Sequence, residues 1–171
     1  SPFSDAEHPF SISCSAAEAA HLTFTIKALG DFTNTIKDLV PGVRVYVDGP
    51  FGAFSIDRHP QAEGFVFIAG GIGITPMMSM LQTMADRQDQ RPCLLVYANR
   101  TWEGVTFREE IEQLQHCLNL QVVWVLSAPD ADWTGESGRI TIELLDHYLP
   151  RSAKRHSQEV FICGPMPMMD T

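Results

Sequence analysis

The chain has 171 residues, 44% hydrophobic and 19% charged, which is typical of a globular protein that buries a core without disulfides or a metal. Its formal net charge is −9 at pH 7 and it has no dense run of Lys and Arg, which excludes nucleic acid as the main partner because phosphate binding needs a basic face. The four cysteines form no Cys-x-x-Cys pair, and no apolar stretch reaches the roughly 18 residues of a membrane span.

The first part of the chain has the pattern of β structure. Apolar and polar residues alternate in residues 22–26 and 43–47, which predicts two half-buried strands, and residues 8–13 predict a shorter one. Apolar residues recur at helical spacing within residues 36–40, and the Pro-Gly pair that follows predicts the end of a short helix. Residues 57–64 (Asp-Arg-His-Pro-Gln-Ala-Glu-Gly) change the composition, and we interpret them as a linker.

After the linker, the pattern alternates between strands and helices. Four apolar runs predict strands that are buried in a parallel sheet: residues 65–69, 94–98, 122–126 and 160–163. A loop rich in Pro, Asp and Gly covers residues 128–138. Because the predicted strands alternate with helices, residues 65–171 are expected to form a doubly wound α/β domain with helices on both faces of the sheet.

Three helices are predicted between these strands. The first begins at Pro76, and one of its faces is apolar: Met77, Met80, Leu81 and Met84. The second follows a capping box formed by Thr106 and Glu109, and the third runs from an N-cap at Thr141 to Leu149.

A glycine-rich loop joins the strand at residues 65–69 to the first of these helices. Its residues are Gly70, Gly71, Ile72, Gly73, Ile74, Thr75 and Pro76. Glycines allow a sharp turn and close approach of phosphate oxygens, and the carboxyl end of a parallel strand is where such folds bind ligands. Thr75 before Pro76 predicts a hydroxyl N-cap followed by proline at the first helical position, where unpaired N–H groups attract an anion. The spacing differs from Gly-x-Gly-x-x-Gly, so the loop predicts a pyrophosphate site, with a ligand-free turn as the alternative.

Two further positions follow strand ends. Arg100 follows the strand at residues 94–98, where NAD-binding folds carry an acid and an arginine accommodates the 2′-phosphate of NADPH. The nearest acid, Glu103, lies past the strand end, so NADPH is favoured over NADH; a solvated surface arginine is the alternative.

Cys163, followed by Gly164 and Pro165, ends the last strand, and we expect it across the sheet from the glycine loop. This motif leaves room for a flat ring, and a buried core cysteine is the alternative.

The methionines at residues 166, 168 and 169 are interpreted as packing residues, and no metal site is predicted because the histidines are scattered.

Together these motifs resemble those of the ferredoxin–NADP reductase superfamily, over nearly the whole chain. The matching elements are residues 69–76, Trp133-x-Gly135-x-x-Gly138, Cys163-Gly164-Pro165, and upstream His8-Pro9-Phe10-Ser11, Gly30-Asp31-Phe32-Thr33 and Gly49-Pro50-Phe51-Gly52. Many members carry Arg-x-Tyr-Ser in place of the His-Pro-Phe-Ser motif. The His-Pro-Phe form resembles ferric reductases and NADPH oxidases, in which a membrane domain with hemes precedes the flavin barrel.

The resemblance implies a partial antiparallel β-barrel segment that binds FAD over residues 1–56, the linker at 57–64, and an NAD(P)-binding α/β domain over 65–171. It implies that Pro9 and Phe10, next to His8, lie against the isoalloxazine, and that Ser11 hydrogen-bonds near flavin N5. The FAD pyrophosphate would be held by Gly30, Asp31, Phe32 and Thr33. The glycine loop would hold the nicotinamide nucleotide, and Cys163 would lie beside nicotinamide C4.

The implied activity is that of a flavin-dependent NAD(P)H oxidoreductase, with Ser11 and Cys163 as catalytic residues. A hydride would pass from NADPH or NADH to FAD, and electrons would pass on to a heme or ferric acceptor. The resemblance also implies that the chain is a soluble piece of a larger protein, on the cytoplasmic side of a membrane, without the first barrel strands and the last helix and strand. Two alternatives remain: a soluble reductase with an iron–sulfur or globin partner, and a nucleotide-sensing module without turnover.

Overall fold

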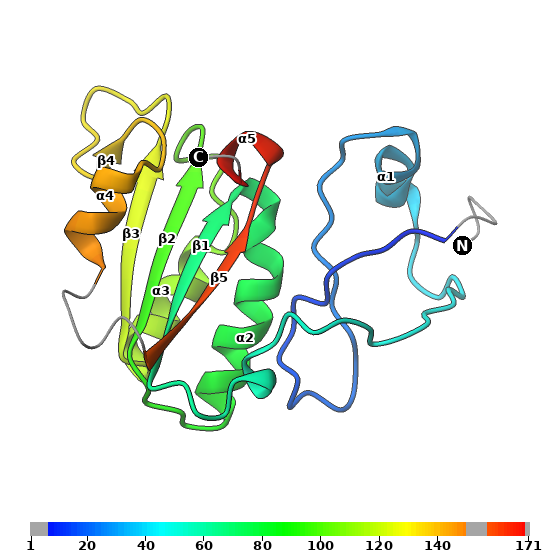
Figure 1. The fold of residues 1–171 in the computed structure, drawn as a ribbon. Helices are drawn as coiled ribbons and strands as arrows, with labels where there is room; N and C mark the ends of the chain where they lie inside the picture. The colour runs from blue at the N-terminus through cyan, green and yellow to red at the C-terminus, as the bar shows by residue number, and fades with distance from the viewer. Residues whose placement is uncertain (1–6, 150–156, 170–171) are drawn as a thin grey trace.

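The computed structural model describes residues 7–149 and 157–169. It has two regions: an α/β domain built on a parallel sheet, and an N-terminal segment, residues 7–62, that lies alongside the first long helix of that domain (Figure 1). In the described ranges, no helix is long and apolar enough to cross a bilayer.

The sheet has five parallel strands in the order β4-β3-β2-β1-β5. Their bounds are β1 Gly64–Gly70, β2 Cys93–Asn99, β3 Leu120–Leu126, β4 Glu136–Ser137 and β5 Gln158–Cys163. The strand order reverses at β1, because β2 to β4 extend to one side and β5 pairs on the other. The predicted parallel sheet is confirmed. Its two-residue strand β4, inside the loop predicted for residues 128–138, is too short to produce a sequence pattern.

Helices cover both faces of the sheet, as predicted. The helices α2 Ile74–Asp86 and α3 Arg108–Cys117 pack on one face, and α4 Ile142–Tyr148 and α5 Met166–Met169 lie on the other (Figure 1). Successive strand residues point to opposite faces, so Phe65 and Phe67 join the core under α2, whereas Val66 and Ile68 join the core under α4. The predicted apolar face of α2 is buried in the first of these cores: Met77, Met80, Leu81 and Met84.

The start of α2 differs from the prediction. The helix begins at Ile74, after the 3₁₀ turn η3 Gly71–Gly73, so Thr75 is not its N-cap and Pro76 occupies its third position. The Thr75 hydroxyl instead donates to the Ile72 carbonyl oxygen at 3.1 Å. Proline is tolerated there because the N–H groups of the first helical turn have no partner within the helix.

The predicted capping box of α3 does not form. The N-cap residue is Phe107, in the left-handed region with φ 63°, so Thr106 lies one residue before the N-cap and Glu109 occupies the second helical position, whereas a capping box needs the N-cap and the third. The predicted N-cap of α4 is confirmed, since the Thr141 hydroxyl accepts a hydrogen bond from the Leu144 N–H at 3.3 Å.

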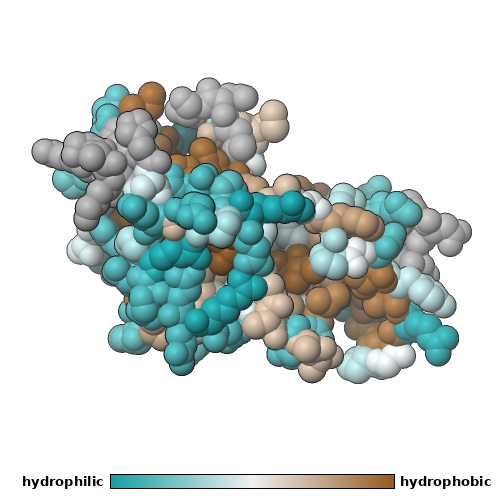
Figure 2. Space-filling model, turned by 60° about the horizontal axis from the view of Figure 1, so that its bottom comes forward, coloured by the Kyte–Doolittle hydropathy of each residue, from teal (hydrophilic) through white to brown (hydrophobic). Residues whose placement is uncertain are grey.

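The N-terminal segment contains none of the three strands that the sequence predicts. Its β pairing, within the described residues, is a single antiparallel bridge between Ile12 and Phe24. It forms the helix α1 Asp31–Thr35, which continues as η1 Ile36–Asp38, and a second 3₁₀ turn, η2 Ile56–Arg58. The strand predictions were wrong because alternation stabilises a strand only where another strand pairs with it. Figure 2 shows hydrophobic side chains at the surface of this segment.

Candidate functional site

The glycine loop lies at the reversal of the strand order, where β1 and β5 end side by side. Ala69 of β1 is in register with Cys163 of β5, so the expectation that Cys163 lies across the sheet from the loop was wrong. The two elements touch, since a Cβ atom on Gly73 would lie 2.2 Å from the Cys163 carbonyl oxygen. Gly71 has φ +52°, in the left-handed region that side chains disfavour. Glycine is therefore required at both positions.

The residues after β5 close over the loop. A Cβ on Gly70 would lie 2.8 Å from both the Met168 sulfur and the Pro165 Cδ atom, and a Cβ on Gly164 would lie 2.3 Å from the Met168 Cε atom. These two glycines give Met168 space to pack. The predicted residues at 70–76 and 163–165 thus lie together at the carboxyl ends of β1 and β5, with Gly70, Gly73, Ile74 and Thr75 buried.

A cleft of about 470 Å³ lies between the N-terminal segment and the α/β domain, where α2 and Cys163 line it. Pro9, Phe10 and Ser11 line one side, and Pro76 and Cys163 line the other. Residues that the sequence assigned to two different motifs, more than 60 positions apart, therefore face the same space. Phe51, from the Gly49-Pro50-Phe51-Gly52 motif, also lines it. The lining residues that sequence reasoning missed include Phe54, Ser79 and Thr83. For Ser79 and Thr83 the available signal was their helical spacing from Pro76.

The two upstream motifs contact each other. The His8 ring stacks on Phe32 with centroids 3.5 Å apart, and Phe10 lies 6.3 Å from the same ring. Gly30 is the N-cap of α1, and the Thr33 hydroxyl accepts hydrogen bonds from the Leu29 and Gly30 N–H groups, both at 2.9 Å. The free donors of this helix start therefore come from the residues after Gly30, beginning with Asp31.

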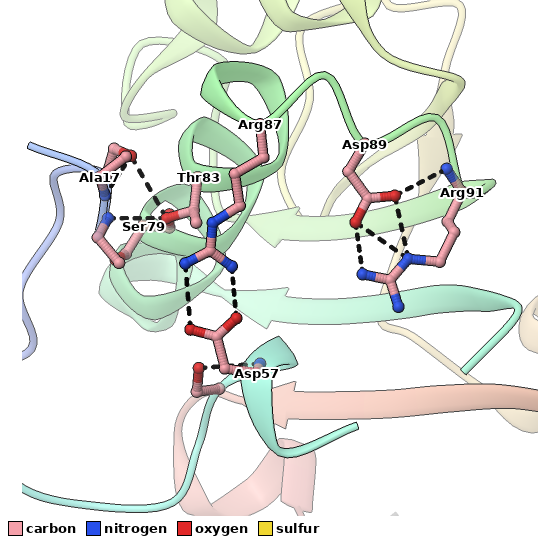
Figure 3. Close-up of polar contacts among 10 residues, drawn as sticks. Ala17, Asp57, Ser79, Thr83, Arg87, Asp89 and Arg91 are labelled. Carbon is pink, nitrogen blue, oxygen red and sulfur yellow. Dashed lines mark hydrogen bonds and ion pairs between the residues drawn. The ribbon is translucent and has the colours of Figure 1, made fainter. Parts of the chain in front are cut away.

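Side chains of α2 hold the N-terminal segment at the base of the cleft (Figure 3). The buried Thr83 hydroxyl accepts from the Ala16 N–H at 2.8 Å and donates to the Ser79 carbonyl oxygen at 2.6 Å. One helical turn later, the Arg87 guanidinium makes a two-point ion pair with Asp57. The same helix that begins at the glycine loop thus fixes the opposite wall of the cleft.

The charges of the cleft are few. Burial raises the pKa of the Cys163 thiol, so this side chain is neutral at physiological pH and acts as a small polarizable wall. The hydrogen bond from Arg87 lowers the pKa of Asp57, which therefore remains a carboxylate. Arg100 lies outside the cleft, exposed at the end of β2. Among residues 7–149 and 157–169, no group of three or more potential ligand side chains could hold a metal ion.

The parallel sheet and the glycine turn at its reversal point define a nucleotide-binding α/β fold. The chain belongs to the family described as the oxidoreductase NAD-binding domain, whose model matches residues 67–171. NADH-cytochrome b5 reductase 1 of Debaryomyces hansenii is 31% identical over 89% of this chain and 54% of its own length. Human cytochrome b5 reductase 4 is 33% identical over 88% of this chain and 30% of its own length. The chain thus spans about half or less of these two relatives.

Solved structures agree with this family. The CS-b5R domains of human Ncb5or in the NAD⁺ form superpose with a TM-score of 0.78 at 30% identity, over 95% of this chain and 50% of that one. A ferredoxin NADP⁺ reductase from Neisseria gonorrhoeae, with bound FAD and NADP, shares the fold, with a TM-score of 0.73 at 22% identity over 94% of this chain and 68% of that one. The predicted resemblance to the ferredoxin–NADP reductase superfamily is confirmed.

Proposed function

We propose that the chain is the region of a flavin-dependent NAD(P)H oxidoreductase in which a nicotinamide nucleotide and FAD meet. One observation carries the proposal: a single cleft is lined by Pro9, Phe10 and Ser11 from the N-terminal segment and by Pro76 and Cys163 from the α/β domain. The proposed division into a flavin-binding segment (1–56), a linker (57–64) and an NAD(P)-binding domain (65–171) follows from this arrangement.

The ends of β1 and β5, next to the cleft, fit a pyrophosphate and a flat ring. Gly71 has open space where a side chain would stand, and the loop leads into the 13-residue helix α2, whose first N–H groups favour an anion. Gly70 and Gly73 allow the residues after β5 to pack closely against the loop. The neutral Cys163 and the Gly164-Pro165 turn would bound the nicotinamide ring. The role of these residues, with Ile74 and Thr75, is to bind and orient the donor.

The residues of the N-terminal segment that line the cleft fit the isoalloxazine ring of FAD, the hydride acceptor. Pro9 and Phe10 offer apolar atoms to the isoalloxazine, and Ser11 offers a hydroxyl for a hydrogen bond near N5. The helix start at Gly30, with Asp31, Phe32 and Thr33, is proposed for the FAD pyrophosphate, and the His8–Phe32 stack ties it to the ring-binding residues. When bound, FAD accepts a hydride and releases single electrons. The protein's contribution is alignment of the two rings, which requires no acid–base pair.

The proposed acceptor is a protein that carries heme or a ferric center. The names of the relatives, cytochrome b5 reductases, favour a heme protein. The His8-Pro9-Phe10-Ser11 motif favours a ferric-reductase-like setting, in which a heme-bearing membrane domain accepts the electrons on its cytoplasmic side. Reduction rates with cytochrome b5, ferric citrate, ferredoxin and globin as acceptors separate these settings from the alternative of an iron–sulfur or globin partner.

The proposal is tested on the complete protein, purified without added cofactor. Its absorbance spectrum should show bound flavin, and NADPH or NADH should bleach that flavin under anaerobic conditions. If the protein contains no flavin and neither nucleotide bleaches added FAD, the oxidoreductase proposal fails and a binding module without turnover is left.

A further inference from the structure

Tyr97 lies fully buried in β2, beside Ala69 at the end of β1. Its ring belongs to the core under α2 and α3 and lies 5.8 Å from the Trp124 ring. Phenylalanine would fill this volume equally well. Burial of a hydroxyl costs free energy unless the group is hydrogen-bonded, so the hydroxyl itself needs an explanation.

The hydroxyl donates to the Gly71 carbonyl oxygen at 3.1 Å, in the middle of the glycine loop. The same oxygen accepts the Ile74 N–H at the start of α2, so both of its lone pairs are engaged. Burial raises the pKa of Tyr97, which keeps the hydroxyl protonated and able to donate at physiological pH. Tyr97, 26 positions from Gly71 in the sequence, thus fixes the orientation of the peptide group between Gly71, whose φ is positive, and Ile72.

The orientation of that peptide determines what the loop presents to an anion. In a trans peptide the C=O and N–H groups point in opposite directions, so a Gly71 carbonyl directed at Tyr97 turns the Ile72 N–H away from the core. Ile72 belongs to η3, the turn that leads into α2, and N–H groups at such helix starts have no partner within the helix. With the opposite orientation, a carbonyl oxygen would face the phosphate and repel it.

We propose that Tyr97 is a positioning residue of the nucleotide site, whose hydroxyl holds the Gly71–Ile72 peptide so that its N–H faces the pyrophosphate. This inference rests on the proposed function, since it assigns a role within the same site. Tyr97 touches neither the ligand nor the reacting atoms. The Tyr97 hydroxyl therefore strengthens binding of the pyrophosphate and leaves the alignment of the rings at Cys163 unchanged.

The test compares Tyr97→Phe with the wild type in the complete flavoprotein. Binding of ADP-ribose and NAD⁺ to the oxidised protein is measured by titration calorimetry, and kcat and KM for NADH and NADPH are measured separately. One lost hydrogen bond should weaken both ligands roughly three- to tenfold. KM should rise by the same factor with kcat unchanged, because the interaction is equal in the ground and transition states.

A matched control is Tyr148→Phe. The Tyr148 hydroxyl donates to the Glu136 carboxylate at 2.6 Å, on the opposite face of the sheet from Tyr97. This variant should bind both ligands as the wild type does. Unchanged affinity in Tyr97→Phe, or equal weakening in both variants, would overturn the inference. A wild type that binds neither ADP-ribose nor NAD⁺ would instead contradict the proposed function itself.

Discussion

In β1 every side chain is buried, whereas in the N-terminal segment Val45 is 50% exposed, Tyr46 83% and Phe51 81%. Both regions carry apolar residues in strand-like patterns, yet only β1 has a strand on each side, β2 and β5. The difference lies in pairing, because both neighbours of β1 belong to the α/β domain itself. The side of the cleft that we propose for the nucleotide is thus built by one region alone, while the side proposed for the flavin relies on contacts with α2.

Substitution of Gly73 should have the largest effect, because it disturbs the self-contained region. In Gly73→Ala the new Cβ would meet the Cys163 backbone at 2.2 Å, which requires β5 or the loop to move. We expect a loss of about 2–4 kcal/mol in the free energy of unfolding, measured by urea denaturation, and loss of nucleotide binding.

The matched control is Gly30→Ala in the N-terminal segment, where a Cβ would meet no atom within 4 Å. It should change stability by less than about 1 kcal/mol. If the two variants are equally stable, the loop can accommodate a side chain at position 73, and the steric argument for glycine at this position is wrong.

Arg100 tests the nucleotide preference of the α/β domain. The side chain is exposed at the end of β2, so Arg100→Ala should leave stability unchanged and raise KM for NADPH roughly tenfold, with little effect on NADH, if it binds the 2′-phosphate. The exposed Arg58 of the N-terminal segment serves as control, and Arg58→Ala should affect both nucleotides equally little. An equal rise for NADPH and NADH in Arg100→Ala would sink the 2′-phosphate role.

Thr83 tests the contact between the two regions. Thr83→Val keeps the shape of the side chain but removes the acceptor of the Ala16 N–H, at a cost of about 1 kcal/mol. Hydrogen exchange at Ala16 should accelerate while exchange in β1 and β2 stays slow. Ser79→Ala is the control, because Thr83 bonds to the Ser79 backbone and not to its side chain. If exchange at Ala16 is unchanged, this bond does not hold the segment.

The sequence predicted the four main strands, the apolar face of α2 and the glycine turn, because each depends on residues within one element or one turn. It misplaced the start of α2 by two residues, since a 3₁₀ turn through Gly71–Gly73 leaves no mark in a helical pattern. The strands at 22–26 and 43–47 were wrong because alternation does not say whether a partner is present. The Ala16–Thr83 bond joins residues 67 positions apart, and no local pattern encodes such a contact.

The smallest effect is expected at the ion pair between Asp57 and Arg87, where the two regions meet again. Both side chains are about half exposed, so Asp57→Asn should cost less than about 1 kcal/mol, with faster exchange at Ala16 and an unchanged α/β domain. The hydrogen bond from Arg87 lowers the pKa of Asp57 below its usual 3.8. The stabilisation is therefore complete above that usual value and is lost as the pH falls through the lowered pKa.

The stability difference between wild type and Asp57→Asn should accordingly be constant near neutral pH and disappear in strong acid; high salt should also shrink it. Asp89→Asn is the matched control, because Asp89 pairs with Arg91 inside the α/β domain and the hydrogen bond from Arg91 likewise lowers the pKa of Asp89. That variant should destabilise the domain with the same pH dependence but leave exchange at Ala16 unchanged. If both variants accelerate exchange at Ala16 equally, the segment is held by the stability of the domain as a whole rather than by the contacts on α2.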